Sequence, residues 1–241
     1  GSEMCIRDRF YKWLIVPEEV IKAKPEVNYN INNIMFKNLI IFSEMGSGKT
    51  ETVRSIVERI VEEYGEDKVN AISSPNGDLE LLMNSLDDRL VQVLFCDNLT
   101  LKRIDKDVLH EYFKIRHYWK DQVKRDYGYI ISILACHRFH GITTELRTNV
   151  DCILVRNSSL NPYDQIIIRK FIGDDGVVDL QIIEAYKDRI PELKKYSIFT
   201  TKFMKGILYT PMAKKNYLKV VEEEPSTYYY RLFLGKYGRV R

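Results

Sequence analysis

The sequence lacks a long apolar run, a strong net charge and a closely spaced pair of cysteines. Its apolar stretch YIISILAC, at 129–136, falls far short of the roughly 20 residues that a membrane-spanning helix needs, so we expect no membrane-embedded segment. The formal net charge is only +3, so a nucleic-acid-binding surface would have to be a local patch. These absences are typical of a globular cytoplasmic protein.

The cysteines are also few, and none belongs to a C-x-x-C pair. We expect buried, reduced thiols, with a zinc site or a disulfide as the less favoured alternative. The residues concerned are Cys5, Cys96, Cys136 and Cys152.

Apolar runs alternate with amphipathic segments over most of the chain. The apolar runs predict buried strands at 36–42, 69–74, 91–98, 129–136 and 150–155. Helical spacing of apolar residues, or a capping pattern, predicts helices at 50–64, 78–86, 104–119 and 161–171. Residues 177–189 fit either a helix or half of a hairpin, and 197–201 with 206–210 predict a closing strand pair. Strands that alternate with helices imply an α/β fold, with a parallel sheet covered by helices on both faces.

The segment SEMGSGKT, at 43–50, fits the phosphate-binding pattern G-x-x-x-x-G-K-[ST] except at its first position. It follows a predicted strand and precedes a predicted helix, which is the context in which this pattern binds phosphate. Glycines let the backbone amides wrap around phosphate oxygens, and the helix N-terminus adds partial positive charge. Ser43 replaces the first glycine, which would cost about 1–2 kcal/mol only if its backbone needs a positive φ.

This loop predicts an ATP site. Lys49 would reach the β- and γ-phosphates, and the Thr50 hydroxyl would bind Mg²⁺. The residues assigned to the nucleotide are Met45, Gly46, Ser47, Gly48, Lys49, Thr50 and Glu51.

An acidic residue opposite the threonine is expected to complete the metal site. Asp97 ends the third predicted strand, and sites in parallel sheets lie beyond the carboxyl ends of the strands. Asn98 follows where a glutamate would supply a base; it could orient a water molecule but could not deprotonate it. Glu44 and Glu51 are alternative bases on the loop side, and the choice stays open.

Three further segments carry a family resemblance. They are Arg116-His117-Tyr118, His137 at the end of the fourth predicted strand, and Leu146-Arg147-Thr148-Asn149 before the fifth. Together with the loop and Asp97, they resemble the FtsK–HerA superfamily of DNA-pumping ATPases, and most of all the genome-packaging ATPases of poxvirus-like and related viruses. The resemblance spans residues 36–157. His137 stands where these proteins usually have glutamine, and Asn98 stands where they have a second acidic residue.

The resemblance implies a RecA-like (ASCE) P-loop fold and an ATP-hydrolysing motor that moves double-stranded DNA. It also implies viral genome packaging in the host cytoplasm, a ring-shaped homo-oligomer, and capsid proteins as further partners. His137 would sense the γ-phosphate, and Arg147, ahead of Arg116 or Arg138, would act as an arginine finger in a neighbouring subunit. The alternatives are a nucleoside or small-molecule kinase and an ATP-binding switch with little turnover.

The chain then divides into three predicted parts. Residues 1–35 form an N-terminal segment that opens on Gly1-Ser2, which is typical of a cloning remnant. Residues 36–210 form the ATPase domain. Residues 211–241 form a small C-terminal extension rich in basic and aromatic residues, which could contact DNA or pack on a neighbouring subunit.

Overall fold

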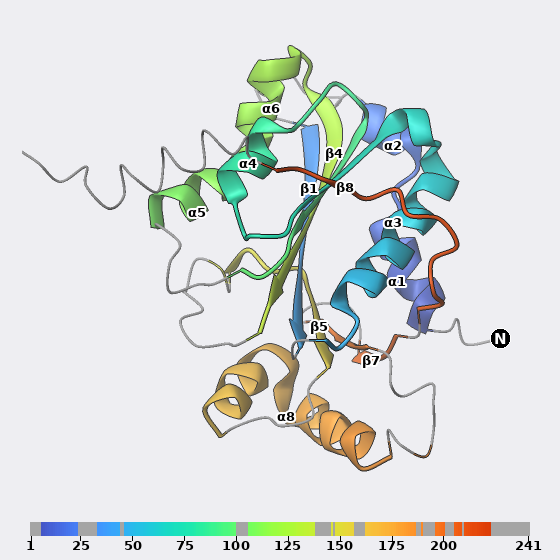
Figure 1. Cartoon of the computed structure of the whole chain (residues 1–241), viewed down its shortest axis with the longest axis vertical. Helices are drawn as coiled ribbons and strands as arrows, with labels where there is room; N and C mark the ends of the chain where they lie inside the picture. Colours follow the sequence, from blue (N-terminus) through green and yellow to red (C-terminus); the bar gives the residue numbers. More distant parts are fainter. Residues whose placement is uncertain are drawn as a thin grey trace, which may run out of the picture.

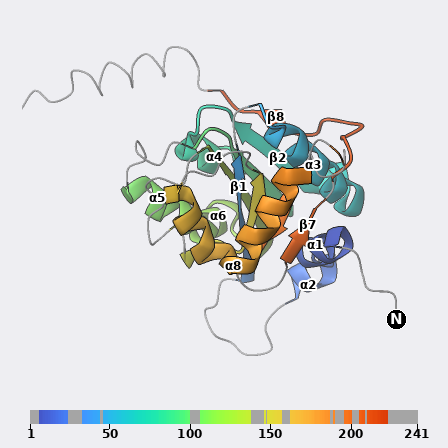
Figure 2. The same ribbon diagram turned by 90° about the horizontal axis from the view of Figure 1, so that it is seen from below.

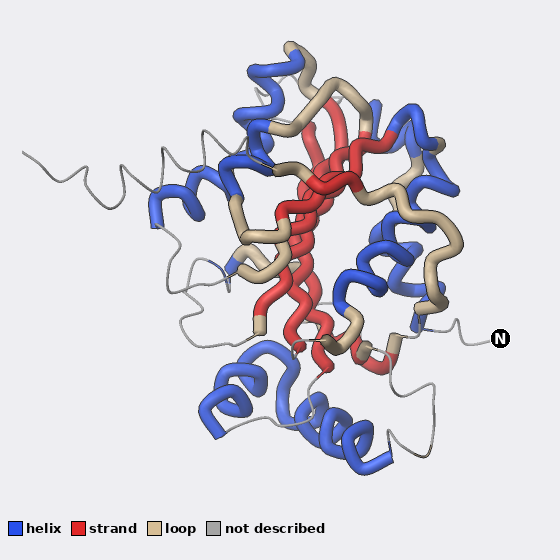
Figure 3. The backbone as a smooth tube through the Cα atoms, in the orientation of Figure 1, coloured by secondary structure: helices blue, strands red, loops and turns tan. Residues whose placement is uncertain are grey.

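The structure is a computed structural model. It describes residues 6–23, 33–43, 46–99, 106–137, 146, 148–156, 162–186, 189, 196–200, 205–208 and 210–222. These residues build one eight-stranded sheet with helices against it (Figures 1 and 3).

The sheet has the strand order β7-β6-β5-β1-β4-β3-β2-β8. The six strands from β5 to β8 in this order run parallel, while β6 and β7 extend the β5 side in antiparallel fashion. Because β4 lies between β1 and β3, this order fits the RecA-like fold that the family resemblance implies. The bounds are β1 (Asn33–Ser43), β2 (Val69–Ser74), β3 (Val91–Cys96), β4 (Tyr127–Cys136), β5 (Cys152–Arg156), β6 (Ser197–Phe199), β7 (Lys205–Ile207) and β8 (Lys219–Val220).

Helices cover both faces of the sheet, as Figure 1 shows with the sheet near the centre. On one face lie α1 (Ile6–Leu14), α2 (Glu18–Lys22) and α3 (Lys49–Tyr64), followed by a short 3₁₀ turn, η1 (Glu66–Lys68). On the other lie α4 (Leu79–Asn84), α5 (Lys106–Phe113) and α6 (Ile115–Val123). The long helix α8 (Pro162–Tyr186) lies near the carboxyl ends of β1 and β5 and is closest to the viewer in Figure 2.

The central strands read as continuous apolar runs because both of their faces are buried. In β1, Leu39 and Ile41 join the core under α1 and α3, while Ile40 and Phe42 join the core under α4 and α5. All four side chains are fully buried or nearly so. The predicted strand at 36–42 is therefore confirmed, and it extends further at both ends.

The helix predicted over 104–119 is wrong as a single element. The described part of this segment contains α5 and α6, separated at Lys114, whose ψ of 8° leaves the helical range. Both helices bury aromatic side chains against β4: the Tyr112 hydroxyl contacts the Ser132 hydroxyl at 2.7 Å, and Trp119 packs over Gly128. Apolar spacing continues across the break, so periodicity alone does not show it.

In the C-terminal half of the chain, the structure distinguishes between the helix and the hairpin that the sequence left open for residues 177–189. Residues 177–186 are helical and belong to α8, which is interrupted at Gly173 by a positive φ of 75°. The closing strand pair is confirmed as β6 and β7. The division into three parts stays a prediction, although α1, α2 and β8 all lie on the sheet of the central part.

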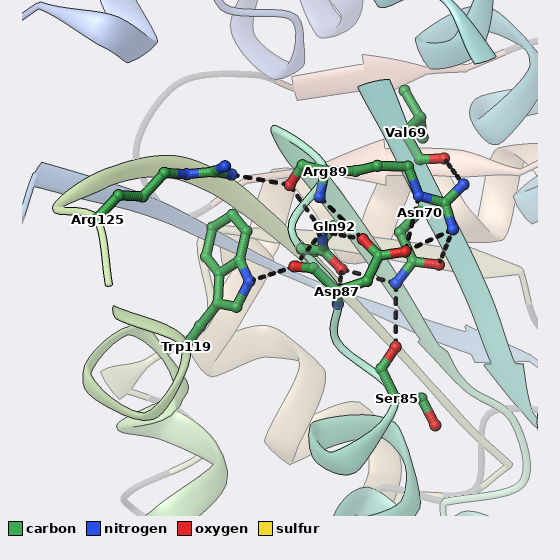
Figure 4. A network of polar contacts seen from close by, with 8 residues as sticks. All are labelled: Val69, Asn70, Ser85, Asp87, Arg89, Gln92, Trp119 and Arg125. Atoms are coloured by element: carbon green, nitrogen blue, oxygen red, sulfur yellow. Dashed lines mark hydrogen bonds and ion pairs between the residues drawn. The ribbon is translucent and has the colours of Figure 1, made fainter. Parts of the chain in front are cut away.

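A polar network, which we call the amino-edge network, lies where β2, β3 and β4 begin (Figure 4). The Asp87 carboxylate accepts hydrogen bonds from Arg89 Nε at 2.8 Å and from Gln92 Nε2 at 3.0 Å. Arg89 also donates to the Val69 carbonyl and to the Asn70 side chain. Burial acts to raise the pKa of the Asp87 carboxyl, but donation from Arg89 and Gln92 outweighs it and lowers this pKa below its ordinary value.

Candidate nucleotide-binding site

The loop between β1 and α3 has the backbone shape that the glycine pattern predicts. Gly46 and Gly48 have φ values of 73° and 89°, in the left-handed region that favours glycine. A Cβ at either position would meet no atom within 4 Å, so the backbone conformation, and not lack of space, requires glycine here. Gly48 is the N-cap of α3, and Lys49 is the first helical residue. The loop therefore leads directly into a helix N-terminus, where anions are stabilised.

Ser43 is compatible with the loop despite replacing the first glycine of the pattern. It is the last residue of β1, it is fully buried, and its φ is not positive. The backbone strain considered for this position is therefore absent. Its hydroxyl contacts the Ser47 hydroxyl within the loop, which glycine could not do.

The Lys49 side chain lies across the loop and is only 6% exposed. Its ammonium lies 3.3 Å from the Ser43 carbonyl oxygen and 3.2 Å from His137 Nδ1. Burial lowers the pKa of Lys49 from its ordinary value, and the negative charge of Asp97 only partly opposes this. A buried cation whose charged form is disfavoured gains stability when an anion approaches, so this position suits a phosphate.

Asp97 and Asn98 form a turn directly after β3. Asn98 has a φ of 56°, a conformation that asparagine tolerates better than most residues. Its amide hydrogen is donated to Asp97 Oδ1 at 2.9 Å, and its Nδ2 donates to the Pro75 carbonyl at 3.1 Å. Gly77 packs closely against this turn, because a Cβ there would lie 3.1 Å from the Asn98 carbonyl oxygen.

His137 follows β4 and joins this turn to the loop. Its Nε2 lies 2.6 Å from Asn98 Oδ1 and its Nδ1 faces the Lys49 ammonium. Since an amide oxygen only accepts, Nε2 donates to Asn98 Oδ1, while Nδ1 lies 3.2 Å from the Lys49 ammonium and 3.3 Å from the Ser43 carbonyl oxygen. These contacts connect Lys49, the first residue of α3, through His137 after β4 to Asn98 after β3.

The remaining residues predicted for the nucleotide occupy the loop or the first turn of α3. Thr50 is half-buried as the second helical residue, and Glu51 forms an ion pair with Arg54 on the surface of α3. Met45 lies outside the described residues, as do Glu44, Arg147, Arg138 and Cys5.

The described residues of the other two resemblance segments lie away from the loop. The Tyr118 hydroxyl donates to Asn84 Oδ1 on α4, and α6, which carries residues 116–118, precedes the amino end of β4. Asn149 lies before the amino end of β5, where its carbonyl accepts from the Asn38 side chain. Residues 116–118 therefore lie toward the sheet edge opposite the loop, and Asn149 lies beside the middle of β1.

Two residues at the loop were not predicted from the sequence. Arg156, the last residue of β5, pairs in register with Ser43 and donates from Nη1 to the Ser47 carbonyl at 2.8 Å. The Tyr196 hydroxyl lies 3.4 Å from Ser43 Oγ and 3.3 Å from Ser47 Oγ. The position of Arg156 at a strand end could have identified it, by the same reasoning that identified Asp97. No sequence signal marks Tyr196.

The donor set fits a Mg²⁺-nucleotide. Mg²⁺ prefers oxygen ligands and usually needs only one or two protein ligands besides substrate phosphates, which matches the Thr50 hydroxyl and the Asp97 carboxylate. Within the described ranges, no group of three or more His, Cys, Asp or Glu side chains is placed to hold a metal ion. Cys96, Cys136 and Cys152 are free and buried, as expected for reduced thiols, and burial raises the pKa of Cys136 to about 12.

The strand order and the loop define a RecA-like P-loop protein. No protein-family model matches the chain, and no curated protein matches it. Its fold is similar to EssC (ATPases 2 and 3) from Geobacillus thermodenitrificans, with 14% identity and a TM-score of 0.42, over 85% of this chain and 45% of that one. It is also similar to the pCW3 conjugation coupling protein TcpA, monomer form with ATPγS, with 11% identity and a TM-score of 0.39, over 83% of this chain and 69% of that one.

These similarities assign neither an activity nor a partner to this chain, which spans less than half of the EssC structure that it matches. No helix in the described part of the chain combines the length and the apolar character that crossing a membrane would require.

Proposed function

We propose that this protein binds Mg-ATP and hydrolyses it by in-line attack of water on the γ-phosphate, and that hydrolysis drives the movement of double-stranded DNA. The observation that carries the nucleotide part is the buried Lys49 ammonium beside a loop whose two glycines have left-handed backbones. Lys49 and the loop amides neutralise negative charge on the phosphate oxygens.

Thr50 and Asp97 would hold Mg²⁺, and this ion would neutralise charge on the β- and γ-phosphates. The chain from Lys49 through His137 to Asn98 suits a phosphate sensor. An anion that attracts the Lys49 ammonium competes with His137 Nδ1 for its protons, so binding and release of phosphate change the contact between β4 and the turn after β3.

DNA translocation, viral packaging, a ring-shaped oligomer and capsid partners rest on the resemblance of residues 116–118, 137 and 146–149. Arg147 is proposed as the arginine finger in trans.

A second candidate function is an ATP-dependent switch with little turnover. Asn98 favours it, since its Oδ1 and Nδ2 are both engaged, with His137 and Pro75 respectively, and an amide is no base. Glu51 is also engaged, with Arg54. The catalytic base stays open, with Glu44 and Glu51 as the proposed alternatives.

The experiment that tests these functions measures phosphate release with and without duplex DNA, together with Mg-ATP binding by calorimetry. The motor requires hydrolysis that duplex DNA stimulates, and the switch requires tight binding without turnover. Phosphate transfer to an added nucleoside would instead indicate a kinase. Light scattering with and without Mg-ATP tests ring formation. Failure to bind Mg-ATP at all would overturn the motor and the switch together.

A further inference from the structure

The phosphate loop is held from the β5–β6 side by two side chains that no motif includes. Tyr196 immediately precedes β6, is 1% exposed, and accepts a backbone hydrogen bond from Leu208 at 3.0 Å. Its backbone is therefore anchored to the sheet edge, and its phenol reaches into the loop. Arg156 approaches the loop from the end of β5.

The phenol of Tyr196 lies among hydroxyl groups from both ends of the loop. Ser43 begins the loop, Ser47 lies within it, and their hydroxyls contact each other. The Tyr196 oxygen lies about equally far from both, at 3.4 and 3.3 Å, and also interacts with the Thr52 hydroxyl on α3. Burial raises the pKa of Tyr196, so the phenol remains a proton donor near neutral pH.

Arg156 restrains the same part of the loop through the backbone. Its guanidinium donates to the carbonyl of Ser47, which lies between Gly46 and Gly48. Glycine-rich segments lose more conformational entropy on ordering than other segments do, so contacts that order the loop in advance strengthen ligand binding.

We propose that Tyr196 and Arg156 are positioning residues that hold the phosphate loop in its binding conformation before the nucleotide arrives. The proposal rests on the proposed function as far as the nucleotide is concerned. The other part of the proposal, that the two side chains order the loop, applies to the protein without nucleotide.

Tyr196→Phe tests the proposal, because it removes the hydroxyl and keeps the buried ring. Tyr112→Phe is the matched control: it removes an equally buried hydroxyl, bonded to Ser132 and remote from the loop. One hydrogen bond is worth about 0.5–1.5 kcal/mol, so the Kd for Mg-ATP should rise about 2- to 10-fold in Tyr196→Phe and stay unchanged in Tyr112→Phe. Arg156→Met should act in the same direction as Tyr196→Phe.

Hydrogen exchange without nucleotide separates this proposal from the proposed function. The amides of residues 46–49 should exchange several-fold faster in Tyr196→Phe, while amides in the middle of α3, such as that of Ile56, should keep the wild-type rate. Equal exchange at 46–49 in wild type and Tyr196→Phe overturns the positioning role, whether or not the protein binds nucleotide. If the wild type binds no Mg-ATP but residues 46–49 still exchange faster in Tyr196→Phe than in wild type, only the proposed function is overturned.

Discussion

Both edges of the parallel sheet carry a buried or half-buried charged side chain, but the surroundings favour the charged form at one edge and disfavour it at the other. At the amino edge, Arg89 and Gln92 donate to the Asp87 carboxylate, and the pKa of Asp87 falls, so the charged form is favoured. At the carboxyl edge, burial lowers the pKa of Lys49, so the charged form is disfavoured. A side chain whose charged form is favoured stabilises the fold, whereas a side chain whose charged form is disfavoured is stabilised when a ligand of opposite charge binds.

This comparison distinguishes a structural polar network from a binding site without reference to any motif. The amino-edge network joins strands through side chains that satisfy one another (Figure 4). The carboxyl edge combines a desolvated cation with two left-handed glycines and a helix N-terminus, all of which favour an anion.

Replacing Lys49 by alanine should have the largest effect. We expect ATP hydrolysis to fall by about 10²–10³-fold, the size typical for loss of one group that stabilises the transition state. The thermal midpoint should stay the same or rise slightly, because a desolvated cation is removed. Phosphate release and thermal unfolding measure the two quantities.

Lys68→Ala is the matched control for this prediction. Lys68 is a partly exposed lysine beside the amino edge, where it pairs with Glu18 at 2.7 Å. We expect wild-type hydrolysis from it. Hydrolysis that survives in Lys49→Ala, or is lost equally in both variants, would contradict the role assigned to the carboxyl edge.

Replacing Asp87 by alanine should produce the reverse pattern. Arg89 and Gln92 would lose their shared acceptor, so we expect the free energy of unfolding to fall by about 2–3 kcal/mol. The affinity for Mg-ATP should stay unchanged. Urea unfolding and calorimetry give the two values, with the exposed Asp121 on α6 as the control position. A loss of affinity in the folded variant would show that the amino-edge network influences the nucleotide site.

The two ends of α3 each have a glycine, one at the carboxyl edge of the sheet and one at the amino edge, and replacing each by alanine compares their roles. Gly48 and Gly65 precede and follow this helix, both with positive φ. Each substitution should destabilise the fold by about 1–2 kcal/mol through backbone strain. Only Gly48→Ala should also weaken Mg-ATP binding, because only that glycine shapes the loop. Equal affinity in the two variants, measured by calorimetry, would remove the case for a shaped phosphate loop.

The smallest expected effect is on the acid sensitivity of the amino edge. The pKa of Asp87 in the folded state is below its ordinary value of 3.8, so its stabilising contribution is present above about pH 4 and is lost as the pH falls through the lowered value. Asp87→Asn should therefore be less stable than wild type by about 1 kcal/mol at pH 7, and this difference should narrow toward pH 3. Unfolding in urea at both values measures it, and a constant difference would show that the charge of Asp87 contributes nothing.

Much of the fold could be predicted from local patterns. Each of the five central strands was located within a few residues, because a strand buried on both faces must be apolar throughout. The break at Lys114 escaped prediction because it depends on how Tyr112 and Trp119 meet β4, which apolar spacing does not encode. The capping pattern that opens the predicted helix at 78–86 is confirmed, because the Asp78 side chain accepts the Leu81 amide hydrogen.

The candidate site was predictable only where its residues follow strands or belong to the loop. Asp97 and His137 could be placed near Lys49 because the carboxyl ends of parallel strands meet at one edge. Tyr196 could not, since it lies 153 residues from Ser43 and belongs to a segment that joins the sheet in antiparallel fashion. The compatibility of Ser43 was also undecided until its backbone φ was known.

Local sequence is enough to specify the phosphate loop, because glycines, a lysine and a hydroxyl residue between a strand and a helix act through their own backbone and their immediate neighbours. It also determined the class of fold, because alternating buried strands and amphipathic helices can bury their apolar faces in few ways. Local sequence does not specify which distant side chains support the loop or which charges neutralise one another. Those outcomes depend on strand order and register, which bring together residues far apart in the chain.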